Sequence, residues 1–239
     1  MFTISLGTIV ALIAGYAVWI PVGSIVLSIS VGVLVLVGCN ILVSRRFYKM
    51  ITALMETVEK DIRSERIDAA LDKLKAVYKY QHWQLFLKKQ LDAQVGSLLY
   101  ARKRFDEALP YMQNAFVKNW MTMCMLASHY YRQKDYDNAL KTMEKTTKSN
   151  KKEAFPYSLY AYMLVEQNQQ AKAIETLTKG TEKIPLDERL QNELDAVRNN
   201  KKIKIQNYGA LWMQMHLDKV PDGGKQYQAL LMNQRFKRK

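Results

Sequence analysis

The sequence is poor in the residues that build disulfide frameworks and metal centres. Its 239 residues include two cysteines and three histidines. Cys39 lies in an apolar run, Cys124 lies in a methionine-rich segment, and neither belongs to a C-x-x-C pair. The histidines, at positions 82, 129 and 216, have neither a second histidine at i+4 nor a cysteine within ligand spacing. These absences argue against a disulfide-stapled fold, and we expect no metal site.

The motifs that accompany nucleotide and acyl-transfer chemistry are also missing. The sequence contains no G-x-x-x-x-G-K-[ST], no G-x-G-x-x-G and no G-x-S-x-G. Acidic residues are frequent in the expected helices, but no pattern pairs them in an apolar setting that would alter a carboxylate. We therefore expect no cofactor and no enzymatic activity. No nucleic-acid-binding module is present either, so nucleic acid is not an expected partner.

Charge is absent from the first 44 residues, and Arg45 is the first charged side chain. One straight helix of that length would extend about 65 Å, whereas the hydrocarbon core of a bilayer is about 30 Å thick. The segment Pro21–Gly23 offers a turn near its middle. We predict a transmembrane helical hairpin over residues 1–44, with spans at about 2–20 and 22–43.

Small residues recur every four positions in both spans, at Ala11 and Gly15 in the first and at Ser24, Ser28 and Gly32 in the second. Such a face lets two helix backbones approach closely. One interpretation is that these residues only pack the hairpin together. The alternative is that they support oligomerisation or docking of another membrane protein.

The formal net charge of +14 is carried entirely after residue 44. Arg45, Arg46 and Lys49 follow the second span directly, which by the positive-inside rule predicts a cytoplasmic soluble portion in an inner or plasma membrane. A cleaved signal peptide is the competing interpretation, but a basic n-region and a small-x-small cleavage site are lacking. We expect these residues and the terminal basic cluster to contact anionic lipid; the cluster comprises Arg235, Lys237, Arg238 and Lys239.

Beyond the membrane segment, pairs of small residues recur with a fixed offset. A glycine or alanine is followed twelve positions later by an alanine, with a polar turn between two apolar helical faces. Small side chains at these positions allow two antiparallel helices to cross at about 8–10 Å. The pairs are Gly96 with Ala108, Ala127 with Ala139, and Ala161 with Ala173, and a looser copy joins Val58 to Ala70.

These units resemble tetratricopeptide (TPR) repeats, whose 34-residue pattern they match in detail. The matching residues are Gly96, Phe105, Ala108, Leu109, Ala127, Tyr130, Tyr136, Ala139, Leu140, Ala161, Ala173, Ile174 and Pro185. The resemblance implies an all-α fold, with a TPR-like α-solenoid of about four helix pairs over residues 45–187. It also implies that the first helix of each pair lines a concave groove.

Residues 188–239 are expected to form a capping helix and a basic C-terminal extension. Leu190, Leu194 and Val197 share one helical face, and either Asp187 or Pro185 would begin that helix. The segment 208–217 fits both a helix face and a strand, and we favour a helix. A last short helix is predicted over residues 226–236.

The resemblance also assigns a candidate partner-binding groove, because certain positions of each first helix face the ligand in that family. The surface is aromatic and rich in methionine, which suits a peptide bound through apolar anchors. An equal alternative is that these side chains pack between repeats or against a C-terminal helix folded into the groove. The assigned residues are Tyr100, Met121, Cys124, Tyr131, Arg132, Phe155, Tyr162 and Glu166.

Taken together, these features predict a membrane-anchored scaffold of bacterial type that recruits protein partners, including other membrane proteins, at the cytoplasmic face. The alternative is a small structural or assembly subunit of a larger membrane complex, docked mainly through its hairpin. The partner and the oligomeric state are not specified by the sequence.

Overall fold

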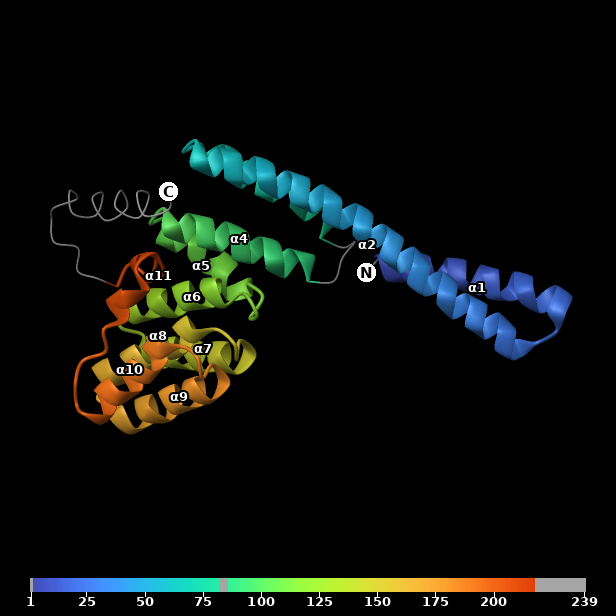
Figure 1. Ribbon diagram of the computed structural model, residues 1–239. Helices are drawn as coiled ribbons and strands as arrows, with labels where there is room; N and C mark the ends of the chain where they lie inside the picture. The colour runs from blue at the N-terminus through green and yellow to red at the C-terminus, as the bar shows by residue number, and fades with distance from the viewer. Residues whose placement is uncertain (1, 82–85, 218–239) are drawn as a thin grey trace, which may run out of the picture. The chain divides into compact units, whose positions relative to one another are not determined.

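The computed structural model describes residues 2–81 and 86–217, and every regular element in those ranges is a helix (Figure 1). The prediction of an all-α fold is therefore confirmed for the described residues. The chain divides into two compact units, residues 1–123 and residues 124–239. The predicted helix at 226–236 and the basic cluster that ends the chain lie outside the described residues.

The first unit begins with a helical hairpin. Helix α1 (Phe2–Val22) runs antiparallel to the first half of α2 (Ile25–Arg63), as the blue ribbons in Figure 1 show. The turn between them contains Gly23 at a φ of +64°, a conformation that a glycine adopts without steric cost. Of the segment Pro21–Gly23 that predicted the turn, Gly23 lies in it, whereas Pro21 and Val22 belong to the end of α1.

The small residues of the two helices meet where the helices cross. A Cβ atom added at Gly15 would lie 3.1 Å from the carbonyl oxygen of Ser28. A Cβ atom added at Gly32 would lie 3.2 Å from the carbonyl oxygen of Ala11. Both approaches leave no room for a larger side chain, so the small residues serve the packing of the hairpin itself.

Helix α2 differs from the predicted second span. It begins at Ile25 rather than at residue 22, and it continues beyond residue 43 as far as Arg63. Its total length is 39 residues. The charged residues after position 44 do not end it, because neither glycine nor proline follows before Arg63. Among the described residues, α2 alone is long and apolar enough to cross a membrane, and the apolar stretch Gly7–Pro21 of α1 is shorter.

Four helix pairs follow one another along the chain, and the end of α2 supplies the first helix of the first pair. The pairs give a TPR-like fold with the helix order that the twelve-residue offset predicts. The remaining elements are α3 (Ile67–Ala76), η1 (Val77–Tyr80), α4 (Leu87–Ala101), α5 (Phe105–Asn114), α6 (Trp120–Arg132), α7 (Tyr136–Ser149), α8 (Ala154–Glu166), α9 (Gln170–Lys183), α10 (Glu188–Arg198), η2 (Ile205–Tyr208) and α11 (Ala210–Met213).

The residues at the predicted helix crossings are buried. Ala70, Ala108, Ala139 and Ala173 are fully buried, as are Val58 and the alanines that precede them by twelve positions. A Cβ atom at Gly96 would come within 2.8 Å of the Met112 Cγ atom and 3.1 Å of the Met112 backbone nitrogen. A larger residue would therefore force Met112 to shift where α4 crosses α5, and the crossing predicted from the sequence is confirmed.

Each turn within a helix pair has the same backbone geometry. A non-glycine residue with φ between +56° and +62° lies five positions before the buried alanine. The next residue donates its N–H to the carbonyl oxygen five positions back, at 2.8–3.0 Å, as in a Schellman motif. The residues with positive φ are Glu65, Lys103, Lys134 and Asn168.

A fifth copy of this turn ends α10. Asn200 has a φ of +55°, and the Lys201 N–H donates to the Ala196 carbonyl oxygen at 2.8 Å. The position of the buried alanine is taken by Ile205, which is fully buried. Helix α10 therefore resembles the first helix of a fifth pair, and its second helix is replaced by η2 and α11.

Of the two residues predicted to begin the helix after residue 187, Asp187 and Pro185, it is Asp187 that caps α10. Its carboxylate accepts hydrogen bonds from the N–H groups of Arg189 and Leu190 at 3.0 and 3.3 Å. By contrast, the helix predicted over 208–217 is confirmed only for the one-turn helix α11. Gly209, at φ +55° and ψ −116°, separates α11 from η2, which ends at Tyr208.

Candidate partner-binding surface

The residues assigned to the groove fall into three classes of exposure. Tyr100, Cys124 and Phe155 are buried, with 3% or less of each residue accessible. Met121, Tyr131 and Tyr162 are partly buried, and Arg132 and Glu166 are exposed. The eight residues thus do not form one open surface, and each class has a different physical role.

Tyr100 belongs to the interior of its helix pair. Its ring makes an edge-to-face contact with the ring of Phe105, with centroids 5.0 Å apart. Such a contact joins the end of α4 to the start of α5 across the turn. Because the side chain is fully buried, its expected role in the groove is replaced by a role in packing.

Cys124 is a packing residue as well. The residue is fully buried, and burial raises the pKa of its thiol well above the usual range. A thiol in such a setting carries little thiolate, which is the nucleophilic and metal-binding form. Among the described residues, no group of three or more His, Cys, Asp or Glu side chains could hold a metal ion.

The groove-side face of α8 is covered by the chain's own C-terminal segment. The Phe155 ring contacts the Tyr208 ring edge-on at 5.1 Å between centroids. About two turns of α8 further on, the Tyr162 ring contacts the Trp212 ring in the same manner at 5.2 Å. For these two side chains of α8, the alternative interpretation applies: they pack against the C-terminal segment of the chain.

A buried polar network holds this segment in place. The Ser158 hydroxyl lies 2.5 Å from the Glu193 Oε2 atom, to which it donates, and 2.8 Å from the Tyr208 hydroxyl. All three residues are buried. Ser158 comes from α8, Glu193 from α10 and Tyr208 from η2, so three elements far apart in the sequence meet at one hydroxyl.

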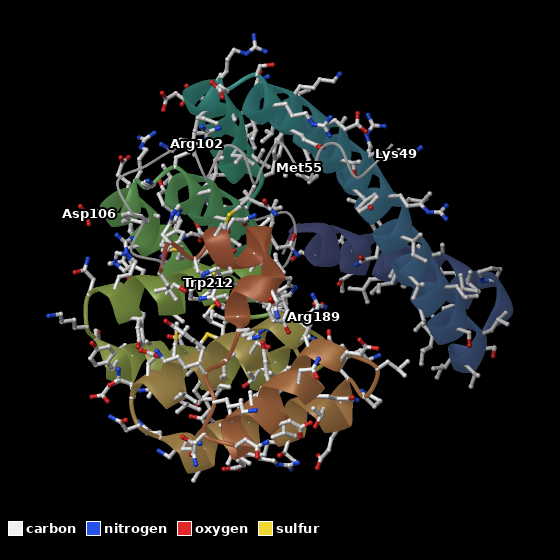
Figure 2. All side chains as sticks on the ribbon, turned by 60° about the vertical axis from the view of Figure 1, so that its left-hand side comes forward. Lys49, Met55, Arg102, Asp106, Arg189 and Trp212 are labelled. Atoms are coloured by element: carbon white, nitrogen blue, oxygen red, sulfur yellow. The ribbon has the colours of Figure 1, made fainter. Side chains whose placement is uncertain are left out.

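Glu193 is perturbed by this setting. Burial raises the pKa of its carboxyl group from 4.5 to about 7, and the hydrogen bond from Ser158 opposes the shift. Burial also raises the pKa of the Tyr208 phenol. The Arg189 guanidinium, whose side chain is labelled in Figure 2, lies over the Tyr208 ring at 4.6 Å and pairs with Asp187 at 2.9 Å. The network therefore has an ion pair on one side, and the carboxyl group at its centre carries less negative charge near neutral pH than an exposed glutamate does.

Sequence reasoning missed Glu193, although the pattern contained a signal. Leu190, Leu194 and Val197 mark the apolar face of α10, and position 193 falls on that same face. An acidic residue on a buried face is rare without a partner, which here is Ser158. The partner itself was not identifiable, because Ser158 lies 35 residues away.

The exposed part of the predicted groove in the second unit consists of Arg132, Glu166 and the edge of Tyr131. The Tyr131 ring packs edge-on against Tyr136 at 5.1 Å between centroids, and burial raises its pKa. Arg132 ends α6 and Glu166 ends α8, so both lie at the same end of consecutive first helices. These residues present charge of both signs beside an aromatic ring.

The basic residues next to the hairpin lie on α2. Arg45, Arg46 and Lys49 are exposed on the continuous helix that follows the apolar stretch, and Figure 2 shows Lys49 projecting from it. The other predicted lipid-contacting residues, Arg235, Lys237, Arg238 and Lys239, lie outside the described residues.

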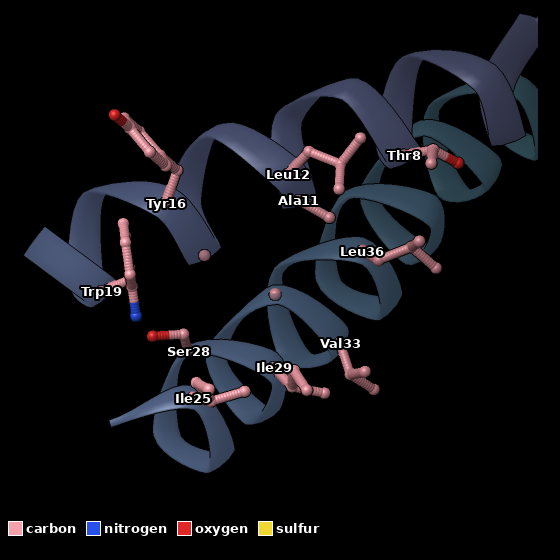
Figure 3. A pocket seen from close by; sticks show the side chains of 12 residues that line it. Thr8, Ala11, Leu12, Tyr16, Trp19, Ile25, Ser28, Ile29, Val33 and Leu36 are labelled. Atoms are coloured by element: carbon pink, nitrogen blue, oxygen red, sulfur yellow. The ribbon is translucent and has the colours of Figure 1, made fainter. Parts of the chain in front are cut away.

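The hairpin carries an apolar groove of about 540 Å³ between α1 and α2 (Figure 3). Both helices contribute to its walls, and Tyr16 and Trp19 stand near the hairpin turn. Their ring centroids are 6.1 Å apart. The lining is almost entirely hydrocarbon, which suits a lipid chain or an apolar helix.

Comparison with known proteins finds likenesses to solved structures only. No known protein family and no curated protein matches the sequence. The solved structure titled "MamA RS-1 ArsTM double mutant" matches with a TM-score of 0.47 and 16% identity over 69% of this chain and 92% of that chain. "MamA 41-end from Desulfovibrio magneticus RS-1" matches with a TM-score of 0.47 and 17% identity over 72% and 97% of the two chains. A functional interpretation therefore depends on the residues of this chain.

Proposed function

We propose that this chain is a membrane-anchored scaffold whose helix pairs bind protein partners at the cytoplasmic face of an inner or plasma membrane of bacterial type. The observation that carries the proposal is the combination of an apolar hairpin with stacked helix pairs in one chain. Helix pairs of this kind expose long surfaces that suit extended or helical peptides. Binding, rather than chemistry, is the proposed activity.

The exposure of the hairpin supports the proposal of two spans. Soluble proteins rarely expose large contiguous apolar surfaces. Here Leu12, Val26 and Leu34 are 69–76% exposed, and many other hydrophobic residues of α1 and α2 are also exposed. A bilayer would cover these side chains, with Arg45 and Arg46 placed at the cytoplasmic headgroups and in contact with anionic lipid.

The proposed partner surface is the exposed end of the first helices, at Tyr131, Arg132 and Glu166. An aromatic residue and an arginine are the residue types that most often dominate a protein interface. The anchor would hold this surface near membrane-bound partners and so raise their effective concentration. Partner choice would then depend on modest contacts rather than on high affinity.

A second candidate function is that of an assembly subunit docked through the hairpin. The apolar groove between α1 and α2 favours it, because a transmembrane helix of a partner could lie along that groove (Figure 3). In this case the helix pairs would act as a spacer, and the exposed ends of α6 and α8 would bind no partner protein.

Site-specific photo-crosslinking in intact cells separates the two candidates. A photoreactive amino acid is introduced at Arg132 or Glu166, with matched controls at the exposed Lys145 and Lys172 on the second helices. We expect a discrete crosslinked protein from the first two positions and none from the controls. Crosslinks obtained only from Leu34 on the hairpin would favour the subunit role. Equal crosslinking from all helix-pair positions would contradict a specific partner surface.

A further inference from the structure

A second, polar pocket lies in the second unit between α10 and the segment that follows it. Its volume is about 330 Å³, near the lower end of the range for small-molecule sites. Apart from Ala196 its lining is polar or charged, in contrast to the groove of the hairpin. The lining residues are Arg189, Asn192, Glu193, Asp195, Ala196, Asn199, Lys201, Lys202, Lys204 and Asn207.

The charge of this pocket is predominantly positive. Four cationic side chains line it, against the two carboxyl groups of Glu193 and Asp195. Glu193 is buried and held by Ser158, and its raised pKa reduces its negative charge near neutral pH. Asp195 is exposed and lies 4.0 Å from Arg198, which is not part of the lining. Arg189 is the one cationic side chain with an acidic partner, Asp187.

Several hydrogen-bond donors in the pocket have no acceptor among the described residues of the chain. The ammonium groups of Lys201, Lys202 and Lys204 make no hydrogen bond or ion pair within the described structure. The side-chain amides of Asn192 and Asn207 likewise have no partner among the described residues. These five donors line the same cavity, and all five residues are exposed. An anion that enters the pocket would therefore meet donors whose hydrogen bonds go to solvent and not to the protein.

The loop that carries these lysines is held rigidly. Its turn at Asn200 is clamped by the Gln170 side chain, which donates to the Val197 carbonyl oxygen at 2.5 Å and to the Asn200 Oδ1 atom at 2.9 Å. Ile203 and Ile205 are buried and anchor alternate positions of the loop. Lys202 and Lys204 alternate with these isoleucines, are exposed and line the pocket, so the anchored loop presents them with a smaller loss of backbone entropy on binding.

The nature of the donors selects the class of ligand. A phosphate group concentrates its charge and three acceptor oxygens on one centre, and lysine ammonium groups bind it as point charges. Asparagine amides add neutral donors to the same oxygens. An extended acidic peptide would instead need a groove with donors spaced along it. We propose that this pocket binds a phosphate-bearing ligand through Lys201, Lys202 and Lys204, with Asn192 and Asn207 as additional donors.

Binding is tested on the full chain in a neutral detergent, with inorganic pyrophosphate as the probe in isothermal titration calorimetry. The triple variant Lys201→Gln, Lys202→Gln, Lys204→Gln should bind at least tenfold more weakly than the parent. The matched control is Lys148→Gln, Lys151→Gln, Lys152→Gln, which removes the same charge from exposed positions in the last turn of α7 and in the turn that follows it. It should retain the parental affinity.

The variant Asn207→Asp offers an independent test, because it places a carboxylate in the pocket while leaving all three lysines. It should also weaken pyrophosphate binding at least tenfold, and circular dichroism should show unchanged helix content. Absence of binding to the parent, or equal weakening in the pocket and control triple variants, would overturn the proposal.

The source of the phosphate is resolved by comparing two further probes. Glycerol 3-phosphate represents a free phosphate ester, and dihexanoyl phosphatidic acid, used below its micelle concentration, represents a lipid headgroup. Tighter binding of the lipid by tenfold or more would identify the ligand as a phospholipid. Equal affinities would identify it as a soluble phosphate ester.

Discussion

At the scale of single residues, Gly96 is the position where the helix pairs tolerate least change. An alanine Cβ atom there would lie 2.8 Å from the Met112 side chain and 3.1 Å from its backbone nitrogen. The side chain can move but the backbone cannot move freely, so Gly96→Ala should lower the free energy of unfolding by about 1–3 kcal/mol. Thermal unfolding followed by circular dichroism measures this effect.

Gly38 provides the matched control for that substitution. It also lies within a helix, but a Cβ atom there would have nothing within 4 Å. Gly38→Ala should leave stability unchanged or raise it slightly, because alanine favours the helix. Equal destabilisation by both substitutions would show that the contact with Met112 is not the cause.

The carboxyl group of Glu193 makes stability depend on pH. Its pKa is 4.5 when unfolded and about 7 when folded, so between these values the folded chain holds a proton that the unfolded chain has lost. Stability should therefore fall as the pH rises from about 4.5 to about 7, by an amount on the order of 3 kcal/mol. The nearby charged and titratable groups are Asp187, Arg189 and Tyr208.

The substitution Glu193→Gln tests this dependence directly. The glutamine is isosteric and uncharged, so its variant should be more stable than the parent at pH 8 and should lose most of the slope below pH 7. Glu182→Gln removes an exposed carboxylate from α9 and should leave the slope in place. Urea unfolding at a series of pH values supplies the measurement, and an unchanged slope in Glu193→Gln would assign it to other groups.

At the scale of elements, the turns within the helix pairs store a small strain. Lys134 has a φ of +61°, which costs an L-residue about 1–2 kcal/mol relative to the right-handed region. Glycine avoids most of that cost but loses more entropy on folding. We expect Lys134→Gly to raise the free energy of unfolding by roughly 0.5–1 kcal/mol.

Lys134→Ala separates this effect from the loss of the lysine charge. Alanine keeps the strained backbone and removes the same ammonium group, so its stability should remain near that of the parent. Chemical denaturation of the three proteins under identical conditions gives the comparison. A gain of equal size in both variants would point to charge rather than to backbone conformation.

The helix pairs were predictable because their signals are local. Gly96 and Ala108 lie twelve residues apart on adjacent helices, and the polar turn between them fixes their crossing. The end of the chain gave no comparable signal. Gly209 breaks the expected helix, and the packing of Tyr208 and Trp212 on α8 joins residues about 50 positions apart. Contacts of that range follow from the folded surface rather than from any periodicity.

The candidate surface was predictable only in part, because contacts between residues far apart in the sequence cover some of its members. The resemblance to TPR repeats assigned Tyr100 and Phe155 by position within a repeat, which ignores what packs on them. Phe105 and Tyr208 cover them in the folded chain. Arg132 and Glu166 are exposed and lie at the ends of α6 and α8, and their contact with a partner stays a prediction.

At the scale of the whole molecule, the distribution of charge predicts orientation in the membrane. The hairpin contains no charged side chain, and Arg45, Arg46 and Lys49 follow it immediately. If the hairpin spans the bilayer twice, the positive-inside rule places these residues and everything after them in the cytoplasm. An alkaline phosphatase, which is active only outside the cytoplasm, fused after Lys239 should therefore show no activity.

Neutral substitutions at the three basic residues should weaken that orientation. In the triple variant Arg45→Gln, Arg46→Gln, Lys49→Gln, part of the fusion population should invert, so phosphatase activity should rise several-fold over the parent. Substitution of three exposed lysines in α7 and its following turn, at positions 145, 148 and 151, removes equal charge far along the chain and should leave the fusion silent. Full activity of the parental fusion would overturn the orientation. A silent triple variant would instead mean that the helix pairs, once folded, hold the chain on one side regardless of the flanking charge.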